Sequence, residues 1–242
     1  MHRFFIEKDQ LPHIYGEDVH HIRDVLRMRP GEKIELLDGQ GKAYSVKIDK
    51  IEKDKITCKI LSVKESAIAP NVRIILAQCL PKAKKMDWII QKSAELGVWR
   101  IIPVISERTI AKGEKPARWQ SIAKEAAQQC GLPFIPEVKP LIKFDDLIFS
   151  AKNYNLALIP WELEQENTLK KSLLSCYPDL HSRIPRYPDI LILIGPEGGF
   201  SQKEILFAKK AGFISVSLGP RILRTETVGI AMLSMINYEF AQ

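Results

Sequence analysis

The fold is decided by Ile190-Leu-Ile-Leu-Ile194, which stops abruptly in Gly195-Pro-Glu-Gly-Gly-Phe200. A run in which every residue is apolar is typical of a strand buried on both faces, as in a parallel sheet. Glycine and proline at the carboxyl end of such a strand expose backbone donors and acceptors to a ligand. Because ligands of open α/β sheets bind at that edge, we expect the functional site there.

The same arrangement is repeated further along the chain. Ser201 and Glu204 have the spacing of a capping box, which predicts a helix that begins after Ser201 and ends at Gly212. A second strand-like run then ends in Leu218 and is followed by Gly219-Pro-Arg-Ile-Leu-Arg-Thr-Glu-Thr227. Tight turns without function are the alternative explanation for the two loops. Two such loops joined by one short helix favour a ligand site instead.

The loops do not have the pattern of a nucleotide phosphate site. Neither Gly-x-x-x-x-Gly-Lys-Ser/Thr nor an early Gly-x-Gly-x-x-Gly is present in the sequence. Glu197 in the first loop would repel a polyphosphate. We therefore expect a ligand that is neutral or cationic where it meets this loop.

Apolar runs and helical patterns alternate through the carboxyl-terminal two thirds of the chain. Such alternation predicts a parallel sheet with helices on both faces, which places the protein in the α/β class. The last helix, from about Thr227 to Phe240, is apolar nearly all round and is therefore buried inside one domain or between subunits. The other predicted elements are strands at Arg73–Gln78, Trp99–Val104 and 156–162, the last of which ends in a polar turn, and helices at 84–96 and Pro116–Gln129.

The amino-terminal part has a different pattern. Between Lys33 and Val63, short β runs are separated by turns, which predicts a small antiparallel barrel or meander. Apolar residues at helical spacing from Val19 to Leu26 predict one short helix before it. Ser66-Ala-Ile-Ala-Pro-Asn71 has the composition of a linker, so we expect one domain at 1–70 and another at 72–242.

Composition limits the possible functions. The net charge is +7, with 13 basic and 12 acidic residues in 1–72 and 23 and 17 in the rest, which mildly favours a polyanionic partner of the larger domain. The four cysteines show no Cys-x-x-Cys spacing, and the adjacent His20 and His21 would point to different faces of a helix, so we expect no metal site. No stretch approaches the roughly 20 apolar residues that a membrane span needs, and we expect a cytoplasmic protein.

The two loops resemble the paired motifs of the SPOUT class of RNA methyltransferases. Within that class they are most similar to the bacterial family that methylates N3 of a uridine in small-subunit ribosomal RNA. One departure is Gln128-Gln-Cys-Gly-Leu132, where the family usually has Glu-Gln-x-Gly-Arg, so a charge pair expected there is absent. The resemblance extends to Lys85-x-Asp87, Gln91-Lys92, Glu95-Leu-Gly97, Ser106-Glu-Arg108, Arg3-Phe4, His21 and Val25-Leu-Arg27.

The resemblance implies a carboxyl-terminal trefoil knot that holds S-adenosyl-L-methionine, preceded by a PUA-like RNA-binding barrel. It also implies a homodimer formed through the carboxyl-terminal domain, and ribosomal RNA, alone or in its particle, as the partner. For the cofactor, glycines let the ligand approach the main chain, and Leu223 is expected against the adenine. The expected cofactor contacts are Ile159, Pro160, Ile194, Gly195, Glu197, Gly198, Leu218, Gly219, Leu223 and Thr225.

Methylation of N3 requires an aligned methyl group, loss of the N3 proton and stabilisation of the negative uracil. Arg224 and Arg221 are the expected cations, with Arg224 preferred. The base stays unassigned among Glu197, Glu226 and a bound water. The expected RNA contacts are Arg3, Arg23, Arg27, Arg29, Lys82, Lys85, Lys92 and Arg108.

Two other functions remain open on the sequence. One is a non-catalytic RNA-binding factor in ribosome assembly, and the other is a SPOUT methyltransferase that acts on a different RNA position. A pure binder has no use for two exposed glycine loops with Arg-x-x-Arg between them, and this favours the enzyme.

Overall fold

A computed structural model describes residues 1–65, 71–83, 85–111, 113–177 and 188–240. The chain divides into two compact units, one made of Met1–Ala69 with Lys124–Ile135 and the other of Pro70–Ala123 with Pro136–Gln242. The expected linker lies outside the described residues except for Asn71, and so does Lys84, at which we expected a helix to begin.

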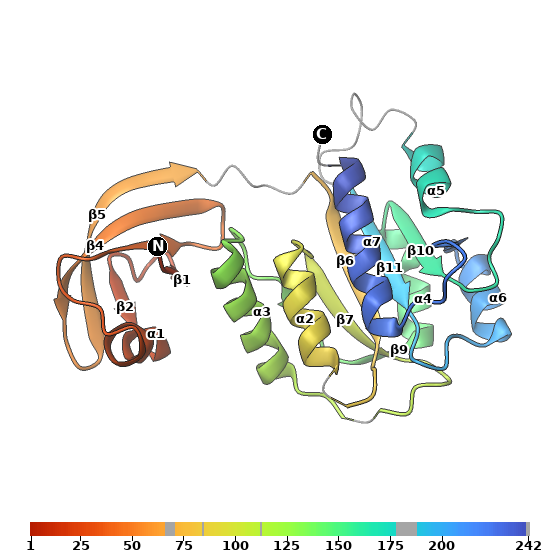
Figure 1. The fold of residues 1–242 in the computed structure, drawn as a ribbon, viewed down its shortest axis with the longest axis horizontal. Coiled ribbons are helices and arrows are strands. Elements are labelled where there is room, and N and C mark those ends of the chain that lie inside the picture. Colours follow the sequence, from red (N-terminus) through yellow and green to blue (C-terminus); the bar gives the residue numbers. More distant parts are fainter. Residues whose placement is uncertain (66–70, 84, 112, 178–187, 241–242) are drawn as a thin grey trace. The chain divides into compact units, whose positions relative to one another are not determined.

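The amino-terminal unit is built on a five-stranded sheet in the order β1-β3-β4-β5-β2 (Figure 1). β1 pairs with β3 in parallel and the other pairs are antiparallel. Within the described residues β1 and β2 are the two edges, so the sheet is a half-barrel, in agreement with the small PUA-like β domain that we expected. Its strands are β1 (Arg3–Phe5), β2 (His13–Tyr15), β3 (Lys33–Leu37), β4 (Lys42–Ile51) and β5 (Lys55–Glu65).

One short helical segment closes the core of this unit, as predicted. It consists of α1 (Glu17–His20) and a π-helical turn, η1 (His21–Val25). Ile22 is fully buried against apolar residues of the sheet. The segment ends where the N–H of Met28 donates to the carbonyl of Ile22, which places Arg27 in the left-handed region at φ 53°.

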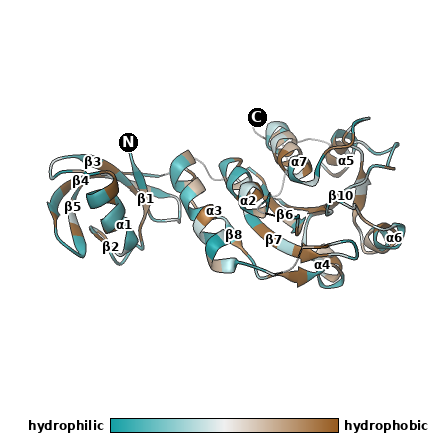
Figure 2. Ribbon diagram, turned by 60° about the horizontal axis from the view of Figure 1, so that its bottom comes forward, coloured by the Kyte–Doolittle hydropathy of each residue, from teal (hydrophilic) through white to brown (hydrophobic). Residues whose placement is uncertain are grey.

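The second unit contains a parallel sheet in the order β12-β10-β11-β6-β7-β8, with β9 also paired to β7. Figure 2 colours much of β7 and β10 as hydrophobic. The strands are β6 (Arg73–Cys79), β7 (Arg100–Ile105), β8 (Glu137–Val138), β9 (Ile142–Lys143), β10 (Leu156–Pro160), β11 (Asp189–Ile194) and β12 (Ile214–Val216). The helices are α2 (Lys85–Glu95), α3 (Pro116–Cys130), of which only the part up to Ala123 belongs to this unit, α4 (Phe144–Ser150), the 3-10 turn η2 (Ala151–Asn153), α5 (Leu169–Cys176), α6 (Gln202–Lys210) and α7 (Thr225–Phe240).

Helices cover both faces of the parallel sheet (Figure 1). In β11, Ile190, Ile192 and Ile194 face the core shared with α2, α3, α5 and α7. Leu191 and Leu193 face the core shared with α4 and α6. The prediction of strands buried on both faces is confirmed, and so is the α/β class.

Two predicted boundaries differ from the structure. β12 ends at Val216, so Leu218 lies in the second loop, and α7 begins at Thr225, two residues earlier than expected. The last helix, which the sequence shows as apolar nearly all round, has one buried and one exposed face in the structure. Met232, Leu233, Ile236 and Phe240 are buried on the sheet, whereas Met235 and Tyr238 are 44% and 70% exposed.

Candidate active site

A pocket of about 460 Å³ lies at the carboxyl ends of β10, β11 and β12, which are neighbours in the sheet. Its walls come from three loops, at 160–162, 194–200 and 216–225, together with Lys85 and Val228. This volume is within the usual range for a cofactor site. The two glycine loops therefore form one site, as the sequence predicts.

The first loop, 194–200, is closely packed around its glycines. A Cβ added to Gly195 would lie 3.1 Å from the ring of Phe200, and one added to Gly198 would lie 3.3 Å from Cβ of Arg108. Gly199 has φ +64°, and its open side faces the carboxylate of Glu162. Larger side chains would thus disturb the loop itself as well as its ligand.

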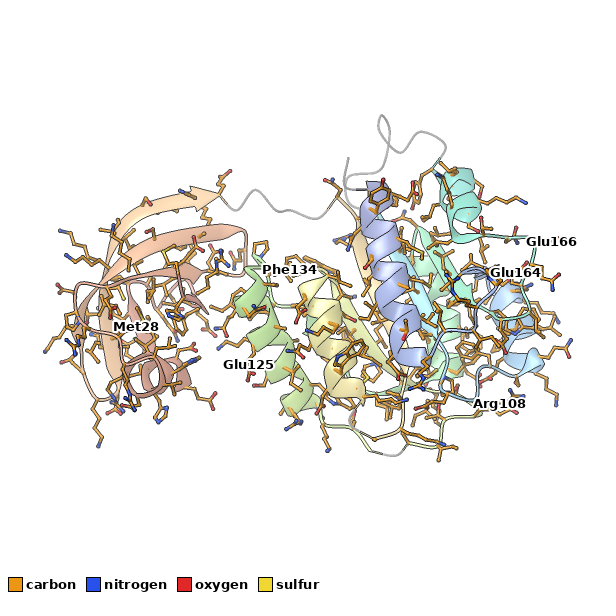
Figure 3. All side chains as sticks on the ribbon, in the orientation of Figure 1. Met28, Arg108, Glu125, Phe134, Glu164 and Glu166 are labelled. Atoms are coloured by element: carbon orange, nitrogen blue, oxygen red, sulfur yellow. The ribbon has the colours of Figure 1, made fainter. Side chains whose placement is uncertain are left out.

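The segment after β7 supports the first loop from outside. Nη1 of Arg108, labelled in Figure 3, donates to the carbonyl of Gly198 at 2.9 Å. The N–H of Glu107 donates to the carboxylate of Glu204, and the Ser201 hydroxyl donates to the carboxylate of Glu107, both at 2.8 Å. Ser201 and Glu204 also form the predicted capping box of α6. These bonds give a structural explanation for the Ser106-Glu-Arg108 motif.

A buried hydroxyl connects the first loop to the beginning of α7. Oγ1 of Thr225 donates to the carbonyl of Gly195 at 2.5 Å and accepts from Nε2 of Gln78 at 3.0 Å. Nε2 of Gln78 also donates to the carbonyl of Cys79 at 2.9 Å. Gln78 is fully buried and Thr225 is 6% exposed. The hydroxyl of Thr225 therefore holds the two pocket loops and β6 together.

The loop that begins at 160–162 is fixed to β12 by Glu164, also labelled in Figure 3. Its carboxylate accepts from the hydroxyl of Ser215, from the N–H of Asn167 and from Nζ of Lys209. These bonds, the one from Ser215 above all, outweigh the cost of burial and lower the pKa of Glu164 to about 2. Lys209 also lies over the ring of Trp161, a residue of the pocket wall.

Lys85, at the start of α2, lies between two carboxylates. Its Nζ is 3.3 Å from Oε1 of Glu197 and 3.2 Å from Oε2 of Glu226. The hydrogen bond to Glu226 raises the pKa of Lys85 most, and together with the smaller contribution of Glu197 it outweighs partial desolvation. Burial opposes ionisation of Glu197, but the N–H of Lys82 and the Lys85 ammonium overcome it, so the pKa of Glu197 lies below its usual value. Lys85 is thus an ammonium and Glu197 a carboxylate at neutral pH.

The two arginines of the second loop, unlike Lys85, have no carboxylate beside them among the described residues. Arg221 and Arg224 line the pocket and are exposed, and their guanidinium groups have no partner among the described residues. Ile222 between them is 87% exposed. Both arginines are therefore available to an anionic substrate.

The structure brings most of the expected site residues together. Every expected cofactor residue lines the pocket except Ile159, which is fully buried in the core below α4 and α6. Of the expected catalytic residues, Glu226 alone is not in the lining and reaches the site through Lys85. Trp161 and Glu162, at the end of the segment 156–162 in which a strand was predicted, also line the pocket. The contacts expected from the sequence did not include several other residues that line or support the pocket, namely Gln78, Pro196, Gly199, Phe200, Val216, Ser217, Ile222 and Val228.

The expected RNA-binding residues fall into three groups: those in ion pairs, those at the pocket, and those that are exposed without a partner among the described residues. Arg3 pairs with Glu35 at 2.7 Å, Arg23 with Asp24 at 2.6 Å, and Lys92 with Glu95 at 2.7 Å. Arg108 supports the first loop, and Lys85 lines the pocket. The side chains of Lys82, Arg27 and Arg29 are exposed and have no partner among the described residues.

Two kinds of feature are missing from the part of the chain that the structure describes. It contains no group of three or more His, Cys, Asp or Glu residues that could hold a metal ion. None of its helices combines the length and the apolar character needed to cross a bilayer.

Comparison with known proteins agrees with this geometry. Residues 69–237 match the model of an RNA methyltransferase domain, and residues 14–61 match that of an RNA methyltransferase PUA domain. The chain is 32% identical to ribosomal RNA small subunit methyltransferase E of Bacillus subtilis, over 99% of this chain and 97% of the relative. Its sequence is 33% identical to that of ribosomal RNA small subunit methyltransferase E from Neisseria gonorrhoeae. The crystal structure of that protein bound to S-adenosyl methionine matches this structure with a TM-score of 0.85 over 98% of this chain and 97% of the other. A methyltransferase of Legionella pneumophila in complex with the same cofactor is 34% identical, with a TM-score of 0.85 over 98% and 96%. The chain thus belongs to the RNA methyltransferase family that includes ribosomal RNA small subunit methyltransferase E.

Proposed function

We propose that this protein transfers the methyl group of S-adenosyl-L-methionine to N3 of a uridine in 16S ribosomal RNA. The observation that carries the proposal is the pocket at the ends of β10, β11 and β12, which combines two glycine loops with Lys85, Arg221 and Arg224. The relatives named above support the cofactor and the class of RNA.

The pocket fits the cofactor in chemistry as well as in size. Its lining joins apolar side chains such as Leu218, Leu223 and Val228 to glycines that leave the main chain open, which suits an adenosyl group bound by backbone atoms. When bound, S-adenosyl-L-methionine supplies an electrophilic methyl group on a positively charged sulfur. Glu162, a carboxylate in the pocket wall, gives the site an acceptor for the cofactor's polar end.

Arg224 acts on the RNA rather than on the cofactor. Its guanidinium is exposed at the pocket and unpaired within the described residues, so it is free to bind the uridine or its phosphate. Glu197 is a poor candidate for the base, because its lowered pKa makes it a weak acceptor for an imide proton. The N3 proton therefore goes to solvent, and Glu197 orients Lys85.

The amino-terminal unit holds the RNA through its exposed arginines. Arg27 and Arg29 should contribute more than Arg3 and Arg23, because the latter already pair with carboxylates. Removing either Arg27 or Arg29 should weaken RNA binding across salt concentrations and reduce the slope of log K against log salt by about 1. If Arg3→Ala and Arg23→Ala change the slope as much as these two, this division of roles is wrong.

The quaternary structure is also part of the proposal. α7, which begins directly after the second loop, buries one face on its own sheet and presents Met235 and Tyr238 outward from its carboxyl-terminal half. A homodimer that joins these faces would place two active sites beside the interface. The family resemblance further implies a trefoil knot around the pocket and a cytoplasmic location, where ribosomal RNA is found. Sedimentation of wild type and Tyr238→Glu tests the dimer, and only the variant should sediment as a monomer.

The decisive experiment combines binding with product analysis. Calorimetry should show that the protein binds S-adenosyl-L-methionine, and mass spectrometry should find 3-methyluridine in 16S RNA from the parent strain and not from a deletion strain. Naked RNA and assembled subunits should be tested separately as substrates. A blank titration would favour the non-catalytic RNA-binding factor, and a methyl group on another atom would identify a different RNA position.

A further inference from the structure

Among the described ion pairs, Lys85 contacts two carboxylates, whereas each other lysine contacts one. Its Nζ lies 3.2 and 3.3 Å from carboxylate oxygens of two residues on different elements, Glu226 and Glu197. Lys92 and Lys50 each approach a single carboxylate at 2.7 Å. Charged hydrogen bonds are usually about 2.7 to 2.9 Å long. The Lys85 ammonium is therefore shared between two longer contacts, and its third N–H has no partner among the described residues.

The same contacts fix the position of this ammonium at the pocket. Its side chain is 35% exposed, and Lys85 belongs to the pocket lining together with Gly195 and Thr225. Stabilisation of a developing charge is most effective when the donor is already oriented before the reaction. Arg221 and Arg224 are exposed and have no such restraint from the described residues. Lys85 is thus the best-oriented cation of the site.

The two carboxylates keep Lys85 in its charged form. Glu197 also accepts the N–H of Lys82 at 2.9 Å, so part of its charge is already compensated at the start of α2. Lys85 remains protonated throughout the neutral range, because both contacts raise its pKa. It therefore serves as a cation and a hydrogen-bond donor, and it cannot serve as the base.

We propose that the Lys85 ammonium donates to a uracil oxygen next to N3 and makes the N3 proton of the target uridine more acidic. This inference rests on the proposed function and names the group that contacts the base. The N3–H bond breaks and its proton leaves to water. The N3 electron pair then forms a bond to the methyl carbon, while the carbon–sulfur bond breaks and its electron pair stays on sulfur. Between loss of the N3 proton and formation of the N–CH₃ bond, the Lys85 ammonium stabilises the negative charge of the uracil and keeps its own three protons.

The acidity of the bound base can be measured without turnover. The substrate is an RNA fragment that the wild-type protein methylates, with 5-fluorouridine at the target position and S-adenosylhomocysteine in the pocket. The ¹⁹F shift of the base is followed against pH in free RNA, with wild type, and with Lys85→Met, Lys85→Arg and Lys139→Met. An opposite charge within hydrogen-bonding range lowers a pKa by roughly one to three units. We expect a decrease of at least about one unit in wild type.

The variants identify the source of this shift. Lys85→Arg should keep most of it because the charge remains, and Lys139→Met should keep all of it because Lys139 pairs with Glu137 outside the pocket. Lys85→Met should lose it. In turnover, Lys85→Met should lose at least about 30-fold in kcat, and 5-fluorouridine, whose N3 is more acidic, should restore more of its rate than it adds to wild type.

Two results would overturn the proposal. One is a bound base whose pKa in wild type equals that of free RNA, which is decisive even if the variants fail to fold. The other is a folded, RNA-binding Lys85→Met protein with the full wild-type shift. If wild type forms no 3-methyluridine at all, the proposed function itself fails. Methylation by wild type without the pKa shift contradicts only the role of Lys85.

Discussion

Replacing Thr225 by valine should loosen the cofactor pocket while leaving its shape almost unchanged. Valine has nearly the volume of threonine, so the substitution creates no cavity and removes only the hydroxyl. That hydroxyl donates to the carbonyl of Gly195 and accepts from Gln78, at 2.5 and 3.0 Å, in a site where Thr225 is 6% exposed. The Gly195 carbonyl then loses this donor, whereas Gln78 keeps its bond to the carbonyl of Cys79.

The magnitude follows from the cost of unpaired buried groups. Each stranded donor or acceptor costs about 1 to 3 kcal/mol, and one of the two partners is only partly stranded. We expect Thr225→Val to lower the free energy of unfolding by about 2 to 4 kcal/mol. Because Gly195 lines the pocket, the affinity for S-adenosyl-L-methionine should also fall, by about tenfold or ~1.4 kcal/mol.

Urea denaturation and calorimetry measure the two effects, and Thr227→Val is the matched control. Thr227 is exposed, so its hydroxyl should be worth less than about 0.5 kcal/mol. Adding Gln78→Leu to Thr225→Val should cost less than the sum of the two single changes, because the two side chains share a hydrogen bond. The reasoning is refuted if Thr225→Val is as stable as the control and binds the cofactor with wild-type affinity.

Three further predictions concern a glycine, an arginine and a carboxylate of the same region. Gly219→Val and Gly212→Val should lose similar stability, because both glycines have φ above +100° and no atom lies near the added Cβ. Only the change at Gly219, which lines the pocket, should raise the Kd for S-adenosyl-L-methionine in calorimetry, by more than about tenfold. Equal Kd values for the two variants would contradict this. Arg224→Ala should lose about 2 to 4 kcal/mol in kcat/KM with unchanged cofactor affinity, and activity within about threefold of wild type would show a structural role. Glu164, whose pKa is lowered from the ordinary 4.5 to about 2, should contribute on the order of 2 to 3 kcal/mol above pH 4.5 and lose it as the pH falls towards 2. The Glu164→Gln protein should therefore be less stable at pH 7, and its stability should depend less on pH between 4.5 and 2; parallel pH curves for the two proteins would exclude this role.

The sequence predicts the elements that carry their own local signal. The all-apolar run at 190–194 needs burial on both faces, and the Ser201–Glu204 capping box begins α6 where the spacing indicates. The error at Ile159 has a simple geometric cause. Successive residues of a strand face opposite sides of the sheet, so Leu158 and Ile159 enter different cores, and only Pro160 at the strand end reaches the pocket.

The contacts between loops could not be predicted, because they depend on the order of the strands. Placing β11 between β10 and β6 brings Gln78 of β6 to Thr225, which is 147 residues away in the sequence. No local pattern contains that order. A signal for Gln78 did exist, since an amide at the end of an otherwise apolar strand requires a hydrogen-bonding partner when it is buried.

Lys85 shows why the chemistry of a residue type needs its surroundings. A lysine in a basic segment is typical of a phosphate contact, and Lys82 remains available for one. Lys85 is drawn into the site by Glu197 of the first glycine loop and Glu226 of α7, over sequence separations of 112 and 141 residues. Glu197 belongs to a pocket loop and also orients the ammonium, so a change in the position of that loop must move the cation. In the proposed complex, cofactor binding and substrate polarisation are therefore coupled through one carboxylate, and a loop too acidic for a polyphosphate would suit a methyltransferase.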